Sequence, residues 1–178
     1  NTRFTIGPSM YYSKRADVVN SIYNYSKTLS AGMQLNASKS KDKKYDVSII
    51  NDFSFNYNNS TQYTNSINYY TNKISTDATI YIKKVWSIGS DINFYYRQKT
   101  AQFNTNLTTQ LWNAKMQRTF KKDEFTVYIL VKDILNQNVG IERNFYSNTL
   151  SEVRNDRLKR YFMFGFAWNF KNKTNTTK

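Results

Sequence analysis

The sequence predicts an all-β chain, an antiparallel transmembrane β-barrel meander of about eight strands. Three observations lead to this prediction. Apolar and polar residues alternate with a period of two in one segment after another, which is the spacing of a strand with two unlike faces. Aromatic residues make up 17% of the chain, yet the mean hydropathy is only -0.72. Short lysine-rich turns also alternate with longer connections rich in Asn, Thr and Tyr.

The segment at 160–170 shows the alternation most clearly. One parity is aromatic throughout and comprises Phe162, Phe164, Phe166, Trp168 and Phe170. A helix would scatter these residues around its circumference, so their period indicates a strand. Such a strand could cover a soluble core, but soluble cores draw mainly on branched aliphatic residues. An aromatic wall is more typical of a strand that faces lipid, with an aromatic belt at the interface.

Seven further segments repeat the alternation, at 3–12, 23–37, 45–57, 70–82, 86–97, 112–120 and 125–135. Pro8 interrupts the first of them, which predicts an edge strand or a local irregularity. The residues expected to face lipid are Phe162, Phe164, Phe166, Ile88, Ile92, Phe94, Val47, Ile49 and Phe53. Those expected to face a lumen are Asp46, Asp52, Lys73, Asp77, Asp91, Asn93 and Arg97.

The connections differ in length between the two ends of the meander. The turns at 39–44, 83–85 and 121–124 are short, whereas the links at 13–22, 58–64, 98–106 and 136–159 are longer. This asymmetry is typical of outer-membrane barrels, whose short turns are periplasmic and whose long loops are extracellular. We therefore expect the last strand to end at the periplasmic rim.

The link at 136–159 is expected to be the longest unstructured stretch and the largest extracellular loop. It mixes charges with aromatic residues, and its candidates for a functional contact are Arg143, Phe145, Tyr146, Arg154 and Arg157. One reading is a lid over the pore mouth or a surface that touches an accessory lipoprotein. The other is a solvated loop with internal salt bridges.

The residue types present limit the catalytic and metal-binding chemistry that the chain could carry out. The chain contains no His and no Cys, so the commonest general base and the thiolate metal ligands are absent. Four acidic residues fall on the polar side of their strands, and a pair of them could form a paired-carboxylate site. They are Asp46, Asp52, Asp77 and Asp91. We favour the other reading, in which these carboxylates line a hydrated lumen and pair with Lys73 or Arg97. We expect no catalysis, no metal and no cofactor.

The net charge of +14 suggests two kinds of anionic partner, nucleic acid and anionic lipid. The lysines gather in turns and the aromatic residues form continuous apolar faces, so no platform for stacking bases results. We expect no nucleic acid. The cations near the long loops suit lipopolysaccharide phosphates, or simply solvate the loops.

Three stretches resemble a known family: Trp112 with Asn113, VKDILNQN at 131–138, and RYFMFGFAWNF at 160–170. They resemble the C-terminal end of a TonB-dependent outer-membrane receptor, of the Bacteroidetes type. Gly165, Trp168 and Phe170 also resemble the terminal assembly signal of outer-membrane barrels. The resemblance implies a barrel of ~22 strands with a plug domain, nutrient uptake driven through a TonB complex, and a place in the bacterial outer membrane.

The sequence contains neither a plug nor a TonB-contact motif. We therefore expect residues 1–178 to be the C-terminal portion of the barrel, an arc whose partners are the remaining strands and the plug. The alternative is a free-standing eight-stranded barrel with a structural or interaction role, because eight strands can close. Its lumen would have to be packed with side chains. The inward residues are mainly Ser, Thr, Asn and Gly, which favours the arc.

Overall fold

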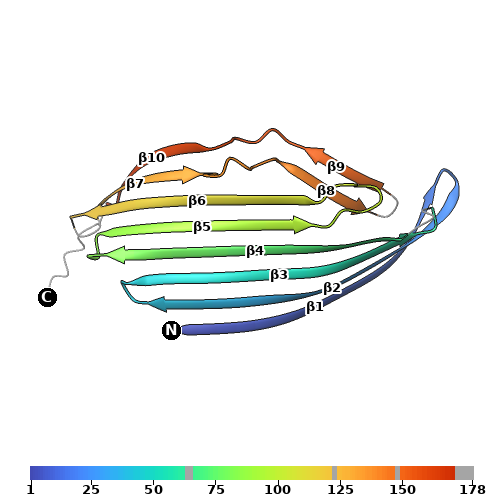
Figure 1. The fold of residues 1–178 in the computed structure, drawn as a ribbon, viewed down its shortest axis with the longest axis horizontal. Helices are drawn as coiled ribbons and strands as arrows, with labels where there is room; N and C mark the ends of the chain where they lie inside the picture. Colours follow the sequence, from blue (N-terminus) through green and yellow to red (C-terminus); the bar gives the residue numbers. More distant parts are fainter. Residues whose placement is uncertain (63–65, 122–123, 147–148, 171–178) are drawn as a thin grey trace, which may run out of the picture.

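The computed structural model describes residues 1–62, 66–121, 124–146 and 149–170. This part of the chain is built from strands and their connections, and no helix in it is long and apolar enough to span a membrane. The strands (Figure 1) are β1 (Thr2–Val19), β2 (Ile22–Lys41), β3 (Tyr45–Ser60), β4 (Ile67–Ile82), β5 (Trp86–Arg97), β6 (Leu107–Phe120), β7 (Phe125–Lys132), β8 (Ile141–Tyr146), β9 (Thr149–Arg154) and β10 (Tyr161–Trp168).

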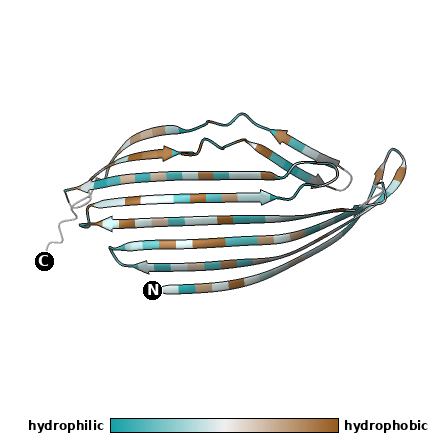
Figure 2. Ribbon diagram, in the orientation of Figure 1, coloured by the Kyte–Doolittle hydropathy of each residue, from teal (hydrophilic) through white to brown (hydrophobic). Residues whose placement is uncertain are grey.

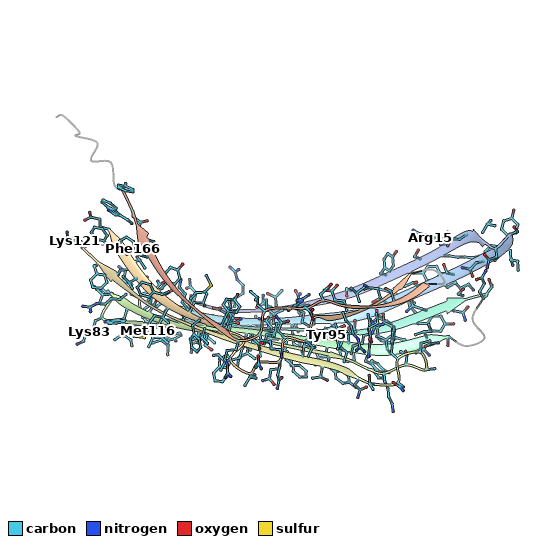
Figure 3. All side chains as sticks on the ribbon, turned by 90° about the horizontal axis from the view of Figure 1, so that it is seen from above. Arg15, Lys83, Tyr95, Met116, Lys121 and Phe166 are labelled. Atoms are coloured by element: carbon cyan, nitrogen blue, oxygen red, sulfur yellow. The ribbon has the colours of Figure 1, made fainter. Side chains whose placement is uncertain are left out.

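Eight of the strands form one antiparallel sheet in the order β1-β2-β3-β4-β5-β6-β7-β10. This arrangement confirms the predicted all-β meander. Seen along its edge, the sheet is gently curved and open (Figure 3), and β1 and β10 are its two edges. Pro8 lies in the edge strand β1, as predicted from its missing backbone donor.

The register gives the sheet two unlike faces. Residues paired directly across neighbouring strands project to the same side, and one such row runs Ile49–Thr76–Ile92–Trp112. Followed from row to row, the register puts all the residues predicted to face lipid on one side, which we call the apolar face. The residues predicted to face a lumen share the other side, the polar face. Brown and teal alternate accordingly along the strands (Figure 2).

Among the residues that the structure describes, no protein layer covers the apolar face. Phe162 and Phe164 are 73% and 74% exposed, and Ile67 and Leu107 are the buried hydrophobic residues of the described chain. A soluble domain would bury such a face in a core. The sheet therefore needs apolar surroundings, which a bilayer supplies.

The short turns lie together at one end of the sheet, as predicted. They connect β2 to β3, β4 to β5 and β6 to β7 (Figure 1). Lys43, Lys83, Lys84 and Lys121 have positive φ angles in these turns.

The expected long link at 13–22 is mostly strand, and the one at 58–64 begins as strand. Residues 13–22 were expected to form a loop, but β1 and β2 continue to a turn at Asn20 and Ser21, whose φ angles are 52° and 62°. Two positive φ angles characterise a type I′ turn, whose twist matches that of paired strands. The hairpin therefore extends beyond the rest of the sheet (Figure 1). Similarly, β3 continues to Ser60, whereas 98–106 connects β5 to β6 as predicted.

The expectation of an unstructured stretch at 136–159 was wrong. Residues Ile141–Tyr146 and Thr149–Arg154 pair as a separate two-stranded hairpin, β8–β9. Its pattern escaped detection because neither side of the hairpin carries an apolar row. It is held instead by charged partners such as Arg143 and Glu152, which lie directly opposite each other. The link remains the longest connection in the sheet.

Gly32 lies where two strands approach closely. A Cβ on this residue would come within 2.8 Å of the Phe53 carbonyl oxygen and 3.1 Å of Ser9 Oγ. We expect Gly32→Ala to lower the free energy of unfolding by about 1–3 kcal/mol, because the backbone of β3 has to move. Urea unfolding in detergent micelles measures the change.

Gly7→Ala is the matched control, since a Cβ there would meet only Gln34 Cβ, at 4.0 Å. Its unfolding midpoint should stay within error of the unmodified protein. Equal losses for the two variants would contradict the steric explanation.

Candidate functional site on the polar face

The polar face is held together by short neutral side chains that bridge neighbouring strands. Ser30 donates to Asn56 at 3.0 Å, and Ser75 donates to Asn93 at 2.8 Å. Ser54 and Thr71 share a hydrogen bond of 2.7 Å. Such bridges leave oxygen and nitrogen atoms facing the space above the sheet, so the face suits contact with water or polar solutes.

Two carboxylates of this face, Asp52 and Asp91, bind amides, and Asp46 accepts a hydrogen bond from the Tyr81 hydroxyl at 2.9 Å. Gln34 Nε2 donates to Asp52 at 2.7 Å, and Asn113 Nδ2 donates to Asp91 at 2.5 Å. The expectation that they pair with Lys73 or Arg97 is not what the structure shows: the ion pairs of the described residues lie elsewhere. Neutral donors satisfy these carboxylates without fixing a long flexible cation across the face.

Asp77 and Asp91 are directly opposite each other on β4 and β5. They are the nearest approach to the paired-carboxylate site considered from the sequence. In the described residues, no group of three or more Asp or Glu side chains is placed to hold a metal ion. The polar face therefore presents two adjacent acids, with Ser48 opposite Asp77 on the other side.

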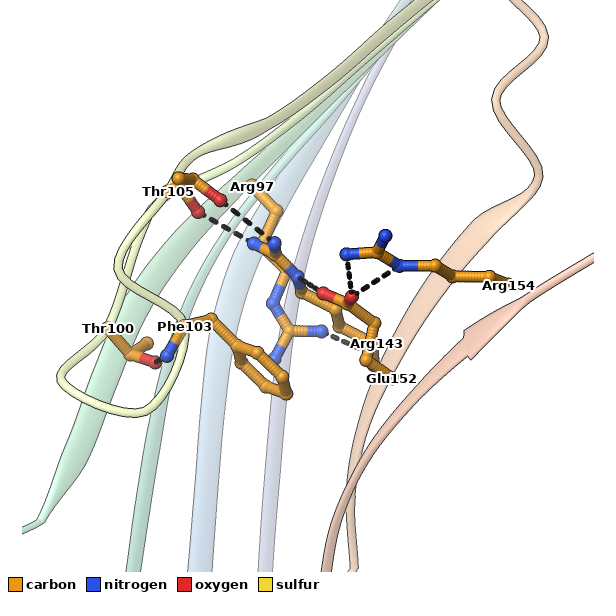
Figure 4. A network of polar contacts seen from close by, with 7 residues as sticks. All are labelled: Arg97, Thr100, Phe103, Thr105, Arg143, Glu152 and Arg154. Atoms are coloured by element: carbon orange, nitrogen blue, oxygen red, sulfur yellow. Dashed lines mark hydrogen bonds and ion pairs between the residues drawn. The ribbon is translucent and has the colours of Figure 1, made fainter.

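Arg97 attaches the hairpin β8–β9 to the polar face. Its side chain is 4% exposed and its guanidinium lies 4.1 Å from the centre of the Tyr69 ring. Arg97 Nη1 donates to the backbone carbonyl of Arg143, the third residue of β8 (Figure 4). A guanidinium placed against an aromatic face gains from the ring quadrupole. Among the described residues, Nε and Nη2 of Arg97 are buried without a hydrogen-bond partner, so Arg97 holds the hairpin through the Nη1 hydrogen bond.

Arg143 connects three parts of the chain. It donates from Nη1 to the Thr105 carbonyl at 2.6 Å, and from Nε to Glu152 at 2.7 Å. Its guanidinium also lies 4.8 Å from the centre of the Phe103 ring (Figure 4). The loop between β5 and β6 is thereby joined to both strands of the hairpin. With its side chain 7% exposed, Arg143 would leave uncompensated groups behind if it were removed.

Glu152 completes the network. Arg143 and Arg154 both donate to its carboxylate, at 2.7 and 2.9 Å, and these hydrogen bonds hold the pKa of Glu152 below its ordinary value of 4.5. A second pair, Arg157 with Glu142, is 2.8 Å long and more exposed. Of the predicted loop candidates, Arg143, Arg154 and Arg157 thus take part in ion pairs. The side chains of Phe145 and Tyr146 lie outside the described residues.

A cavity of about 590 Å³ lies between the hairpin and the polar face. Lys73, Tyr95 and Thr109 line it from the sheet, and Glu142 and Arg157 line it from the hairpin side. Its wall is mixed in charge and keeps some apolar surface from Leu107 and Leu111. This volume is within the usual range of small-molecule sites.

Asp133 has a structural role that the sequence pattern did not predict. It is 4% exposed, follows β7 with a φ of 51°, and accepts hydrogen bonds from the backbone of Gln137 at 2.9 Å and Asn138 at 3.1 Å. Side chains of Asp commonly cap turns in this way. The stretch VKDILNQN therefore directs the chain out of the sheet and toward the hairpin.

Comparison with known proteins identifies the class of this sheet. The model of the outer membrane protein beta-barrel family matches residues 2–168. The chain belongs to this family. It is an outer-membrane β-barrel protein, and its family implies a place in the bacterial outer membrane. No curated protein and no solved structure matches it.

The terminal strand of this barrel protein carries the residues that resemble the assembly signal. Phe125 stacks on Trp168 with ring centres 5.5 Å apart, and Trp168 contacts Phe170 at 4.2 Å. On the polar face, the ring of Tyr128 covers Gly165, where any Cβ would collide with it. A ring laid over a glycine shields the exposed backbone of a strand, so Gly165 is needed for packing as well.

The hairpin contact should depend on pH in one direction. Because the Glu152 pKa is depressed, its contribution to the pairing of β8 with β9 is present above 4.5 and is lost as the pH falls through the lower folded value. A spin label at Ser151→Cys, in a chain that has no other Cys, should be immobile at neutral pH and mobile in acid.

Glu152→Gln should make the label mobile at both pH values, since it removes the charge that two arginines share. An unchanged acid transition in Glu152→Gln would assign the titration to another group.

Gly165 and Tyr128 should be energetically coupled. We expect Gly165→Ala to cost about 1–3 kcal/mol of unfolding free energy, because the Tyr128 ring has to leave its place. In a Tyr128→Ala background the same change should cost less than about 0.5 kcal/mol, which a double-mutant cycle by urea unfolding detects. Equal costs in both backgrounds would show that the ring is not the obstacle.

Proposed function

We propose that this chain is part of the wall of a TonB-dependent transporter for nutrient uptake, and that it catalyses no reaction. The observation that carries the proposal is the hairpin β8–β9. It lies within the connection from β7 to β10, at the end we take as extracellular, and it folds back onto the polar face of an open barrel arc. A structural barrel needs no such element. A transporter needs a restricted, polar lumen in which a solute is held before it passes.

The open sheet supports an arc of a larger barrel. β1 and β10 each pair with a single neighbour in the described chain, and in hydrocarbon the free backbone groups of both edges must find partners. The shallow curvature (Figure 3) suits a wide barrel of ~22 strands better than a tightly wound one of eight. We infer that further strands complete the wall and that a plug domain fills the lumen.

The hairpin gives the lumen its specific chemistry. The cavity beneath it offers a lysine, an arginine and a glutamate together with tyrosine and leucine side chains, a set that suits a polar solute with an apolar part. The TonB complex and a surface lipoprotein are the partners that this role requires. Lipopolysaccharide would contact the loop end. We infer no nucleic-acid partner.

The absence of catalysis rests on residue chemistry. The chain has no His or Cys, and Asp91 is already bound to Asn113 Nδ2. A hydrolytic pair of carboxylates would need a proton donor and a positioned nucleophile. Binding and passage are the functions that these side chains support.

The second candidate is a closed barrel of eight strands, which the number of strands in the sheet favours. The coding region upstream separates the two: a plug domain with a TonB-contact motif supports the transporter, and a signal peptide directly before Asn1 supports the small barrel.

Cross-linking tests closure in the protein itself. Ser9→Cys on β1 and Met163→Cys on β10 place thiols on the polar face of the two edge strands. A short bifunctional reagent should join them only if the edges meet. We expect no intramolecular cross-link in the assembled protein, whereas Ser54→Cys with Thr71→Cys, on paired strands, should react readily. Efficient joining of Ser9→Cys to Met163→Cys would establish the closed barrel.

Removal of the hairpin tests the transport role. We expect deletion of residues 140–156 to leave assembly and heat stability nearly unchanged, because the β7–β10 pairing and the terminal aromatic residues remain. Uptake or ligand affinity should fall at least tenfold, on the order of the 1.4 kcal/mol that a few lost contacts represent. Arg154→Gln, which leaves the Arg143–Glu152 pair in place, is a control that should retain uptake. Normal uptake by the deleted protein would reduce the hairpin to a solvated loop.

A further inference from the structure

The charged residues of the apolar face all have the same sign. They lie near the ends of the strands and are Lys14, Lys27, Lys39, Lys41 and Arg118. The acidic residues of the same eight strands, Asp17, Asp46, Asp52, Asp77 and Asp91, have the opposite parity and belong to the polar face. In the described strands, the lipid side is therefore an apolar band bordered by cations alone.

At the turn end these cations adjoin aromatic side chains. The Arg118 guanidinium lies 5.0 Å from the centre of the Trp86 ring and 4.6 Å from that of Phe120. Lys41 is paired with Tyr45 and Lys39 with Val47, so both extend from the last rows of the apolar face. Aromatic rings and basic side chains in this position mark the headgroup level of a bilayer, where long basic side chains reach out of the hydrocarbon.

The turns at this end add lysines at positions that disfavour them. Lys43, Lys83, Lys84 and Lys121 have φ angles of 54°, 50°, 59° and 48°, a conformation that costs an L-residue free energy and that Gly or Asn adopts more easily. Lys83 and Lys84 occupy both central positions between β4 and β5, where the favoured sequence is Asn-Gly. Turn geometry thus offers no reason for lysine. Strained residues that persist point to a function.

We propose that Lys39, Lys41, Lys43, Lys83, Lys84 and Lys121 form a basic collar that binds the anionic headgroups of phospholipids at the turn end of the barrel. The collar is continuous with the face that contacts acyl chains, so a lipid seated there can place its tail on the apolar band and its phosphate among the lysines. The carboxylate beside Lys43, that of Asp42, is 4.0 Å away and 89% exposed, and such exposed pairs neutralise little. The inference uses the barrel family and not the proposed transport role.

Lipid competition tests the collar. The full-length protein is placed in nanodiscs that contain phosphatidylglycerol and phosphatidylcholine, and native mass spectrometry measures which lipid is retained. We expect a preference for phosphatidylglycerol that weakens roughly fivefold for each lysine removed, the effect of one basic residue near an anionic surface. The variant Lys83→Asn/Lys84→Gly should weaken this preference about 25-fold, while its unfolding midpoint in phosphatidylcholine stays equal or rises, because the strain in the turn is relieved.

Lys115→Gln is the matched control, since Lys115 lies toward the same end but projects from the polar face. It should keep the full preference. If the turn variant assembles poorly, Lys39→Gln/Lys41→Gln gives the same test from within β2. An unchanged preference in the turn or strand variants, or an equal loss in Lys115→Gln, would overturn the proposal. So would a wild-type protein that binds soluble peptidoglycan fragments and shows no preference between the two lipids.

Discussion

The ladder of backbone hydrogen bonds from β1 to β10 is the interaction on which the rest of the structure depends. The described chain buries only Ile67 and Leu107 as hydrophobic residues, so no core holds the strands together. Each strand is instead fixed by its neighbours, and the acyl chains of the membrane replace the missing layer of protein. Every backbone group inside the bilayer must be paired. The register and order of the strands are therefore constrained more strictly than the identity of any single side chain.

This dependence separates the tasks of the two faces. The apolar face contacts lipid through its large apolar surface and needs few specific contacts, apart from the cations and aromatic rings at its borders. Specific contacts lie on the polar face: short side chains bridge strands, amides bind Asp52 and Asp91, and Arg97, stacked on Tyr69, donates to the hairpin carbonyl of Arg143. Changes on the first face should affect insertion, whereas changes on the second should affect how the hairpin is held.

The hairpin is attached by a small number of strong contacts and not by a large apolar interface. Arg97 donates to the Arg143 carbonyl and Arg143 donates to the Thr105 carbonyl, while the Arg143–Glu152 pair holds the two strands of the hairpin together. Contacts of this kind are directional and respond to protonation and to competing anions. An element held in this way can be displaced without disturbing the sheet, because the β7–β10 pairing lies outside the network.

Sequence alone determined the parity of the strands, the location of the short turns and the exclusion of His and Cys chemistry. Period-2 alternation is a local property, and each residue carries it wherever its strand is placed. Only the tertiary structure decided that residues 13–22 continue as a hairpin and that 136–159 folds into β8 and β9 over the polar face. These segments have no apolar stripe to reveal them. The place of 136–159 also depends on a residue distant in the sequence, because Arg97 donates to the Arg143 carbonyl. Such contacts form because the sheet brings the strands together, so no local pattern predicts them.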